Sequence, residues 1–418
     1  MASFLRSYYR RAPQPTSAEL TQLLQRYALS PPRPLDLASL LSFGRPVTST
    51  SVLSSVTYAL AELPRRLAMR VRSLESLPFI VGTNPYIANT LNAYRDSFQL
   101  LATYPAVTTL EQNKQFTQQL DALVQRHAND IPTMAKGCVP SIWRLAYLRF
   151  RSFRFLESAK YMSPTQVSNF LDGAIRNRIS VRLIAEQHIT ISHALEEAMG
   201  VSNIGVVDML CSPSRMIRMC ESYVAELCSA TLGASPSILI DGHPEATFAY
   251  VPVHLEYILT EILKNSFRAT VECHGTSQRT LPPVRITLAP SSPVANGGAQ
   301  SNLFSIRIRD EGGGVSPSNM ARIFSYAFTT AKSNDDVDGG GGPYAAQQHV
   351  GVNLFTEMTS KGLQTGLGSI AGLGYGLPMS KLYAMYFGGS LELLSLEGWG
   401  SDVFLKLRCL DEAGDSAI

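Results

Sequence analysis

The sequence predicts an α+β protein in which an N-terminal helical bundle is followed by an α/β sandwich domain. Two patterns predict this fold class. Apolar residues recur at helical spacing along the first half, and they alternate with polar residues in several segments of the second half. A chain of 418 residues is also long enough to form two domains, each with its own core.

The first half is expected to be helical. Apolar residues from Ile87 to Leu101 recur three or four positions apart, which places them on one stripe of a helix. A second stripe runs from Phe116 to His127 and is expected to stop before Pro132, because proline lacks an N–H and restrains the residue before it. Two more helices are expected near residues 143–156 and 179–199. Long amphipathic helices in series favour an antiparallel bundle.

The second half is expected to be a sheet with helices against one face. Period-two alternation predicts half-buried strands over residues 284–288, 304–308 and 403–407. Helical segments are expected over 253–271, before the first of these strands, and over 378–386, before the last. A loop at about 200–214 is the expected boundary, and the segments 291–301 and 333–372 interrupt regular structure. We therefore expect a helical domain over 26–205, an α/β domain over 206–410 and a short tail over 411–418.

The amino terminus has the composition of a mitochondrial presequence. Arg6, Arg10 and Arg11 lie among serines and tyrosines, and no acidic residue precedes Glu19. Residues 1–25 are therefore expected to be such a presequence, with a basic tail as the alternative. A secretory signal is not expected, because no apolar run follows the arginines.

Composition excludes several other classes of protein. The formal charge of +3 gives no reason to expect nucleic acid as a partner. No apolar run reaches the roughly 18 residues of a membrane span. The six cysteines show no C-x-x-C spacing, so reduced and packed thiols are expected instead of a metal site or a disulfide framework.

A polar helix face in the second half is the first candidate for chemistry. Glu261, Asn265 and Arg268 are spaced at i, i+4 and i+7 and so share one face, while Ile262 and Leu263 point elsewhere. A carboxylate, an amide and a guanidinium on one face could serve as base, magnesium ligand and phosphate partner. A solvated polar face is the alternative.

Two further motifs flank strands. Asp310 follows the strand near 304–309 and precedes three glycines, so its carboxylate could accept from an exocyclic amine while the glycines let a flat ligand approach. A Gly-Trp-Gly-Ser-Asp segment at 398–402 leads into the last strand and places the Ser401 hydroxyl beside the sheet. Taken alone, each could be an ordinary turn.

A Gly-Leu-Gly-Tyr-Gly-Leu-Pro segment at 372–378 precedes a predicted helix. Glycines there expose backbone N–H groups, and the helix dipole adds positive potential, which suits a polyphosphate. The segment is not a Walker A loop, because no G-K-[ST] follows, and it does not have the context of a Rossmann fingerprint.

Taken in chain order, the four elements at 261–268, 310–314, 372–378 and 398–402 resemble the N, G1 and G2 boxes and the final sheet motif of the GHKL superfamily, which includes histidine kinases, type II topoisomerases and the ninety-kilodalton heat-shock chaperone. The Glu-Ile-Leu-Lys-Asn-Ser-Phe-Arg-Ala-Thr-Val segment at 261–271 resembles the mitochondrial 2-oxoacid dehydrogenase kinases. Blocks at 62–68, 131–135, 178–180 and 187–188 also match that family, so the resemblance covers about residues 43–407.

The resemblance implies a GHKL (Bergerat-type) ATP-binding domain and transfer of the ATP γ-phosphoryl group to a serine of the dehydrogenase E1 subunit. Glu261 would be the general base, Asn265 would hold Mg²⁺ and Asp310 would read the adenine amine. The remaining implied nucleotide contacts are Arg268, Gly312, Gly314, Thr329, Thr330, Gly372, Leu373, Gly374, Tyr375, Gly376, Leu377 and Ser401. It also implies docking to the E2 lipoyl domain, a homodimer and a mitochondrial matrix location.

Departures within the family leave the substrate open. Tyr257 replaces a histidine usual in pyruvate dehydrogenase kinases and looks like the branched-chain enzyme. The segments 324–326 and 374–376 instead resemble the pyruvate enzyme, which is the favoured assignment. A histidine kinase would need an acceptor histidine, but His127 and His188 are expected to be structural. An ATP-driven clamp would place its nucleotide domain first, and here that domain comes last.

Overall fold

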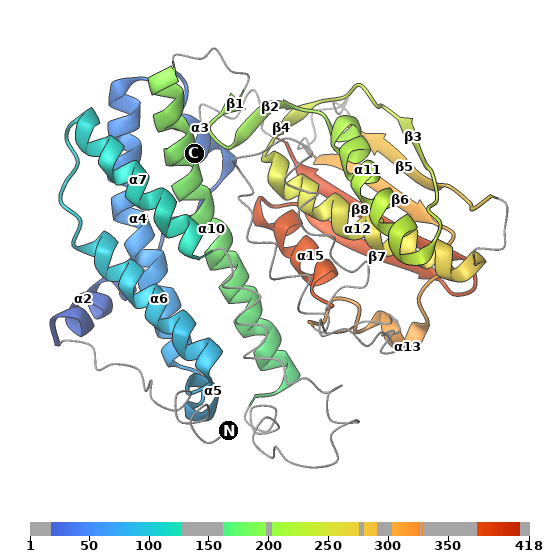
Figure 1. The fold of residues 1–418 in the computed structure, drawn as a ribbon, viewed down its shortest axis with the longest axis horizontal. Coiled ribbons are helices and arrows are strands. Elements are labelled where there is room, and N and C mark those ends of the chain that lie inside the picture. The colour runs from blue at the N-terminus through green and yellow to red at the C-terminus, as the bar shows by residue number, and fades with distance from the viewer. Residues whose placement is uncertain are drawn as a thin grey trace, which may run out of the picture. The chain divides into compact units, whose positions relative to one another are not determined.

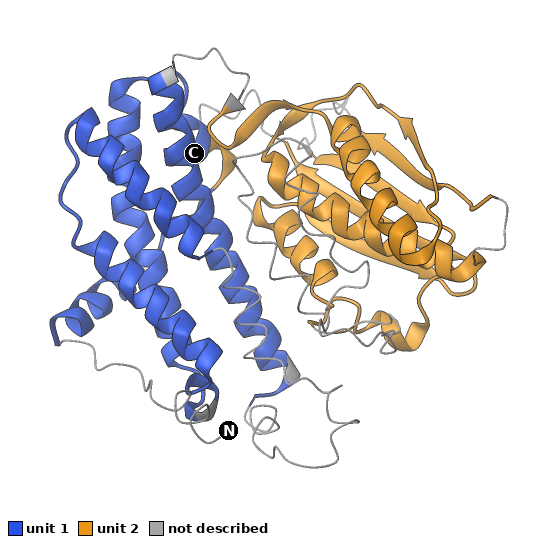
Figure 2. Ribbon diagram, viewed as in Figure 1, with its two compact units in different colours: residues 1–35, 39–200 blue, residues 36–38, 201–418 orange. Residues whose placement is uncertain are grey.

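The computed structural model describes residues 18–127, 162–197, 203–275, 280–290, 303–326, 328 and 374–409. The chain divides into two compact units (Figure 2). One comprises residues 1–35 and 39–200, and the other comprises residues 36–38 and 201–418. Among the described residues, no helix is both long enough and apolar enough to cross a membrane.

The first unit is built from helices (Figure 1). Those described are α2 (Ala18–Ala28), α3 (Leu37–Ser42), α4 (Ser49–Glu75), α5 (Phe79–Gly82), α6 (Pro85–Ala102), α7 (Leu110–Arg126) and α10 (Pro164–Glu197). Helix α4 packs against α2, α6 and α10, and α7 packs against α10. The predicted apolar stripes of α6 and α7 are buried, including Ile87, Phe98 and Phe116.

Buried polar groups tie the bundle together. Glu62 is 1% exposed, and its carboxylate lies 2.8 Å from Arg65 Nη1 and 3.7 Å from Arg66 Nη2. His188 Nδ1 lies 3.1 Å from Ser55 Oγ, and burial lowers the pKa of His188 to about 4.

His127 follows the end of α7. Its Nε2 lies 2.7 Å from Ser97 Oγ, and its ring packs 4.7 Å from that of Tyr94. Both His127 and His188 are therefore structural residues of the bundle, as predicted.

The second unit contains two sheets. Strands β1 (Asn203–Ile204), β2 (Val207–Cys211) and β4 (Phe248–Tyr250) form an antiparallel sheet in the order β1-β2-β4. Strands β3 (Ile238–Gly242), β5 (Val284–Ala289), β6 (Leu303–Asp310), β7 (Ser390–Leu396) and β8 (Gly400–Arg408) form the larger sheet, in the order β3-β5-β6-β8-β7. Strands β3 and β5 are parallel, and the other neighbours are antiparallel.

Helices cover one face of the larger sheet (Figure 1). They are α11 (Pro213–Leu232), α12 (Pro252–His274) and α15 (Gly376–Tyr386), and a short helix, α13 (Pro317–Met320), follows β6. Ile306, Ile308 and Leu405 turn inward from the sheet and are at most 1% exposed. Opposite them, Ile262 and Leu263 of α12 are also buried, which leaves the polar face of α12 turned away from this core.

The structure confirms the three predicted strands and the helices at 253–271 and 378–386, and it corrects the expectation for 200–214. Strands β1 and β2 lie there, and α11 begins at Pro213. Helix α10 begins at Pro164, well before the predicted start at 179, and α15 begins at Gly376. The helix expected near 143–156 and the interruptions at 291–301 and 333–372 lie outside the described residues.

Cysteines largely follow the expectation of packed thiols. Cys211, Cys220 and Cys228 are buried and free, and burial raises the pKa of each, to about 12 for the first two and about 11 for Cys228. Cys273 is exposed instead.

Candidate nucleotide and catalytic site

The polar face of α12 carries four half-buried side chains. They are Glu261, Lys264, Asn265 and Arg268, and each is partly exposed. The residues between them at 262–263 and 266–267 are buried. Lys264 Nζ lies 2.9 Å from Glu261 Oε1, and the two side chains are 16% and 20% exposed. The predicted grouping of Glu261, Asn265 and Arg268 on one face is confirmed, and Lys264 joins it.

Asn265 and Arg268 have polar side-chain atoms that make no hydrogen bond to the described residues. Within the described part of the chain, no side chain or backbone group hydrogen-bonds the Asn265 amide. Arg268 lies 3.7 Å from Glu272 through its Nε, a distance too long for a hydrogen bond, and that buried Nε has no acceptor among the described residues. An amide oxygen suits a hard cation and a guanidinium suits a phosphate.

Asp310 occupies the end of β6 and is 6% exposed. Its Oδ1 accepts from the Gly312 N–H at 3.0 Å and from the Ser401 N–H at 3.2 Å. Burial raises the pKa of Asp310, while the bonds from Gly312, Ser266 and Ser401 act in the opposite direction. These bonds fix the direction of the carboxyl group at the sheet edge.

The antiparallel register explains why Asp310 and Ser401 meet. Strands β6 and β8 pair so that Asp310 lies opposite Ser401. The Ser401 hydroxyl lies 3.3 Å from Ser395 Oγ. Ser401 thus donates its backbone N–H to Asp310. The sequence had pointed to the Ser401 hydroxyl and not to its backbone.

Glycines around Asp310 allow close backbone approach. A Cβ at Gly312 would lie 2.8 Å from the Ala269 carbonyl carbon, and one at Gly400 would lie 3.0 Å from the Asp310 carbonyl carbon. Gly314 has a φ of +69°, which other residues rarely adopt. The Gly312 backbone is therefore packed directly against α12, near its carboxyl-terminal half.

The amino terminus of α15 lies against the middle of α12. Gly374 has a φ of +76°, Tyr375 is the N-cap residue and Gly376 begins the helix. A Cβ at Gly376 would lie 3.1 Å from the carboxyl carbon of Glu261. The Glu261 carboxylate is therefore a close neighbour of the first residue of α15, a helix whose first-turn N–H groups could hold an anion.

Aromatic side chains line this end of the site. The Tyr326 and Tyr375 rings are 5.6 Å apart, and the Tyr257 and Tyr383 rings are 5.0 Å apart. Tyr257 donates from its hydroxyl to Met379 Sδ at 3.5 Å, and burial, together with the Glu261 charge, raises the pKa of the Tyr257 phenol.

Two ends of a site are thus arranged along α12. Gly312 contacts α12 at Ala269, and Gly376 contacts it at Glu261. Eight residues of helix rise about 12 Å between these two contacts. One end therefore offers a buried carboxyl group, and the other offers helix N–H groups and the carboxylate of Glu261.

Four predicted residues, Thr329, Thr330, Gly372 and Leu373, lie outside the described part. Sequence reasoning overlooked three contributors, Lys264, Ser266 and Ser395. The i, i+3 spacing of Lys264 from Glu261 was a usable signal. The contacts of Ser395 depend on strand pairing, which residue spacing alone does not reveal. Its Oγ accepts from Val315 N–H at 2.6 Å.

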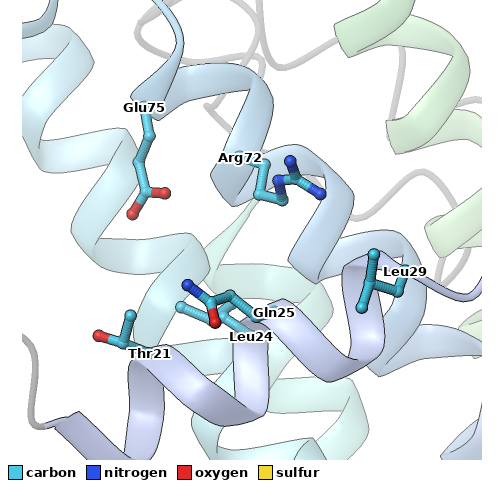
Figure 3. A pocket seen from close by; sticks show the side chains of 6 residues that line it. All are labelled: Thr21, Leu24, Gln25, Leu29, Arg72 and Glu75. Carbon is cyan, nitrogen blue, oxygen red and sulfur yellow. The ribbon is translucent and has the colours of Figure 1, made fainter.

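A cavity in the other unit contains none of these residues. It measures about 420 Å³ and is bordered by Thr21, Leu24 and Gln25 of α2, by Leu29 just after that helix, and by Arg72 and Glu75 of α4 (Figure 3). Glu75 is engaged by Arg95 at 2.6 Å. The only carboxylate among the described residues of its lining, Glu75, is therefore already paired, and this cavity is not the candidate site. Within the described residues, no cluster of His, Cys, Asp and Glu could hold a metal.

Comparison with known proteins assigns both halves of the chain. Residues 34–208 match the model of the mitochondrial branched-chain alpha-ketoacid dehydrogenase kinase, and residues 250–410 match that of the histidine kinase-, DNA gyrase B- and HSP90-like ATPase. An Arabidopsis thaliana protein named mitochondrial [pyruvate dehydrogenase (acetyl-transferring)] kinase is 30% identical over 91% of each chain. The chain belongs to the mitochondrial 2-oxoacid dehydrogenase kinase family.

Other relatives agree. The kinase of the same name from Drosophila melanogaster is 29% identical over 95% of this chain and 87% of its own. Isozyme 3 from Mus musculus is 28% identical over 97% of this chain and 87% of its own. The protein is accordingly a mitochondrial protein kinase with a GHKL ATPase domain, and it uses ATP.

Proposed function

We propose that the protein transfers the γ-phosphoryl group of ATP to a serine of the E1 subunit of the mitochondrial pyruvate dehydrogenase complex and thereby inactivates it. The observation that carries the proposal is the meeting of Glu261 with the first turn of α15, where a base lies beside donors for phosphate. The relatives that bear the name pyruvate dehydrogenase kinase support the choice of substrate.

Glu261 is the proposed general base. Its carboxylate accepts the proton of the attacking serine hydroxyl while the hydroxyl oxygen bonds to the γ-phosphorus and the bond from that phosphorus to the β–γ bridging oxygen breaks, so that ADP leaves. Lys264, 2.9 Å away, fixes the orientation of the carboxylate. A positioned base contributes typically 10²- to 10⁴-fold to rate, and the rest of phosphoryl transfer is chiefly positioning and charge neutralisation.

Asn265 is the proposed Mg²⁺ ligand. Its amide lies on the same face as Glu261, one turn along α12, and no described residue competes for it. An oxygen donor suits Mg²⁺, which usually keeps several waters and takes few protein ligands. The ion, when bound, neutralises charge on the phosphates. Arg268, one turn further along, would neutralise more.

Asp310 is the proposed reader of adenine. Its Oδ1 is occupied by two backbone N–H groups, so the carboxylate is held in one orientation toward an exocyclic amine. Gly312 and Gly314, whose missing side chains let the chain pack tightly behind Asp310, are proposed to contact the base, and residues 374–377 would surround the phosphates with backbone N–H groups. Thr329, Thr330, Gly372, Leu373 and Ser401 are proposed as further nucleotide contacts.

The remaining proposals concern partners and place. The helical unit is proposed to dock the E2 lipoyl domain, and the catalytic unit to pair in a homodimer. Residues 1–25 would direct the protein to the mitochondrial matrix. Basic composition before Glu19 supports this last proposal.

A branched-chain 2-oxoacid dehydrogenase kinase is the second candidate. The family model that matches residues 34–208 carries that name, and Tyr257 favours it. Substrate therefore has to be decided by assay.

Incubation with radiolabelled ATP and each purified dehydrogenase complex tests the proposal. Acid-stable phosphoserine on pyruvate dehydrogenase E1 is expected, and label on the branched-chain complex alone would select the second candidate. If neither complex is labelled, the proposed function is wrong. An acid-labile label on the protein itself would indicate a histidine kinase.

Two variants test the site. Glu261→Gln is expected to abolish transfer while retaining nucleotide binding, and transfer near the wild-type rate would exclude Glu261 as the base. Asn265→Ala is expected to weaken binding of Mg²⁺-nucleotide, as measured by calorimetry. Asn113→Ala is the control, because it also removes an amide side chain but does so in the helical unit. It should leave nucleotide affinity unchanged.

A further inference from the structure

We propose that Gly376 is a positioning residue for the catalytic base: its missing side chain leaves the space in which the Glu261 carboxylate lies between α12 and α15. The inference rests on the proposed function, in which Glu261 is the base. It assigns the glycine a role separate from offering its N–H to phosphate.

A side chain at position 376 would collide with the Glu261 carboxylate where it now lies. A Cβ at Gly376 would lie 3.5 Å from Glu261 Cβ, 3.1 Å from the carboxyl carbon and well inside contact distance of Oε2. Turning the carboxylate away would disturb the 2.9 Å contact of its other oxygen with Lys264 Nζ. A methyl group at this position would therefore displace Glu261, weaken its ion pair, or both.

Neither backbone conformation nor helix formation explains a glycine here. Gly374 has a positive φ, which favours glycine, but Gly376 does not have a positive φ. Gly376 is the first residue of α15, and alanine forms helices far better than glycine. The close approach of Glu261 is a physical reason for the missing Cβ that the folded chain itself supplies.

The effect on the reaction should be selective. Phosphate would contact backbone N–H groups of Gly376 and Leu377, since Pro378 has none, and alanine retains the N–H at position 376. Displacing the base affects proton transfer instead, and a misplacement of about 1 Å can cost on the order of 10²-fold in rate.

Steady-state kinetics and calorimetry with Mg²⁺-ATP test the selectivity. For Gly376→Ala, we expect kcat to fall about 10- to 100-fold while the Kd for the nucleotide rises less than about threefold. Gly173→Ala in α10 is the matched control, since a Cβ there meets nothing within 4 Å, and it should change neither quantity. An unchanged kcat, or a Kd that rises as much as kcat falls, would overturn the inference.

A double-mutant cycle on thermal unfolding gives a second readout that needs no kinase activity. Gly376→Ala should lower the unfolding midpoint in the wild-type background. It should leave the midpoint unchanged or raise it in the Glu261→Ala background, where the conflicting atoms are gone. The same comparison applies if Gly376→Ala alone fails to fold, because the double variant should then recover folding.

The two proposals fail in different ways. Strong coupling between positions 261 and 376, together with normal transfer by Glu261→Gln, would leave the spatial inference standing and exclude Glu261 as the base. Additive effects on stability, together with loss of transfer in Glu261→Gln, would retain the base and refute the role of Gly376.

Discussion

Replacing Asp310 by asparagine separates recognition of adenine from stability of the fold. Asparagine has nearly the same shape and keeps one oxygen, so it can still accept from the Gly312 and Ser401 N–H groups now 3.0 and 3.2 Å from Oδ1. Its second polar atom becomes an NH₂ group. That group would face the exocyclic amine of adenine, and two donors repel.

The magnitudes follow from these contacts. A hydrogen bond to a charged acceptor contributes about 1.5–3 kcal/mol, so losing it should weaken ATP binding about 10- to 150-fold. Stability should change by only about 1 kcal/mol or less, because both backbone donors keep their acceptor. Asp310→Ala, in contrast, leaves both donors without one and should cost up to about 2–6 kcal/mol.

Calorimetric titration of the variant with ATP and with GTP measures the effect. Guanine carries a carbonyl oxygen where adenine carries its amine, so the NH₂ of asparagine can donate to it. The ATP to GTP affinity ratio should fall in Asp310→Asn. Unchanged ATP affinity in a folded Asp310→Asn protein would refute the assignment of Asp310 to the adenine amine.

Three further changes test the helical unit. Glu62→Gln should destabilise it by about 3–5 kcal/mol in urea unfolding, because buried Arg66 loses its anionic partner, whereas a loss below about 1 kcal/mol would show that the network is dispensable. Thr109→Ala removes the capping box of α7 and should cost about 1 kcal/mol by the same assay, and no loss would mean the cap is replaced by water. Burial raises the pKa of Glu186 from 4.5 to about 7, although Arg182 acts in the opposite direction. The folded state therefore holds this proton more tightly than the unfolded state does, and the stability that this contributes is fully present below pH 4.5 and is lost as the pH rises through about 7. In Glu186→Gln, the free energy of unfolding should lose a pH dependence of about 3 kcal/mol over that window. If the variant and the wild type show the same dependence on pH, the pKa of Glu186 is not raised.

Elements with a single strong period could be predicted from the sequence. Strands β5, β6 and β8 alternate, and helix α12 shows its apolar face, because each buries one side only. Helix α4 was not predicted, since Pro64 lies in its interior and proline normally ends a helix. Strands β1 and β4 are only two or three residues long, too short for alternation to show.

For the site, the sequence could predict what one element presents, and could not predict what a partner element adds. Glu261, Asn265 and Arg268 share a face because helix geometry alone requires it. The amide that Ser401 gives to Asp310 depends on the β6–β8 register, and the space that Gly376 leaves for Glu261 depends on how α15 packs on α12. A glycine in a phosphate-binding segment is easily assigned to the phosphate. Only the neighbouring carboxylate shows that the same glycine also sets where the base can lie, so its substitution should affect kcat before it affects nucleotide binding.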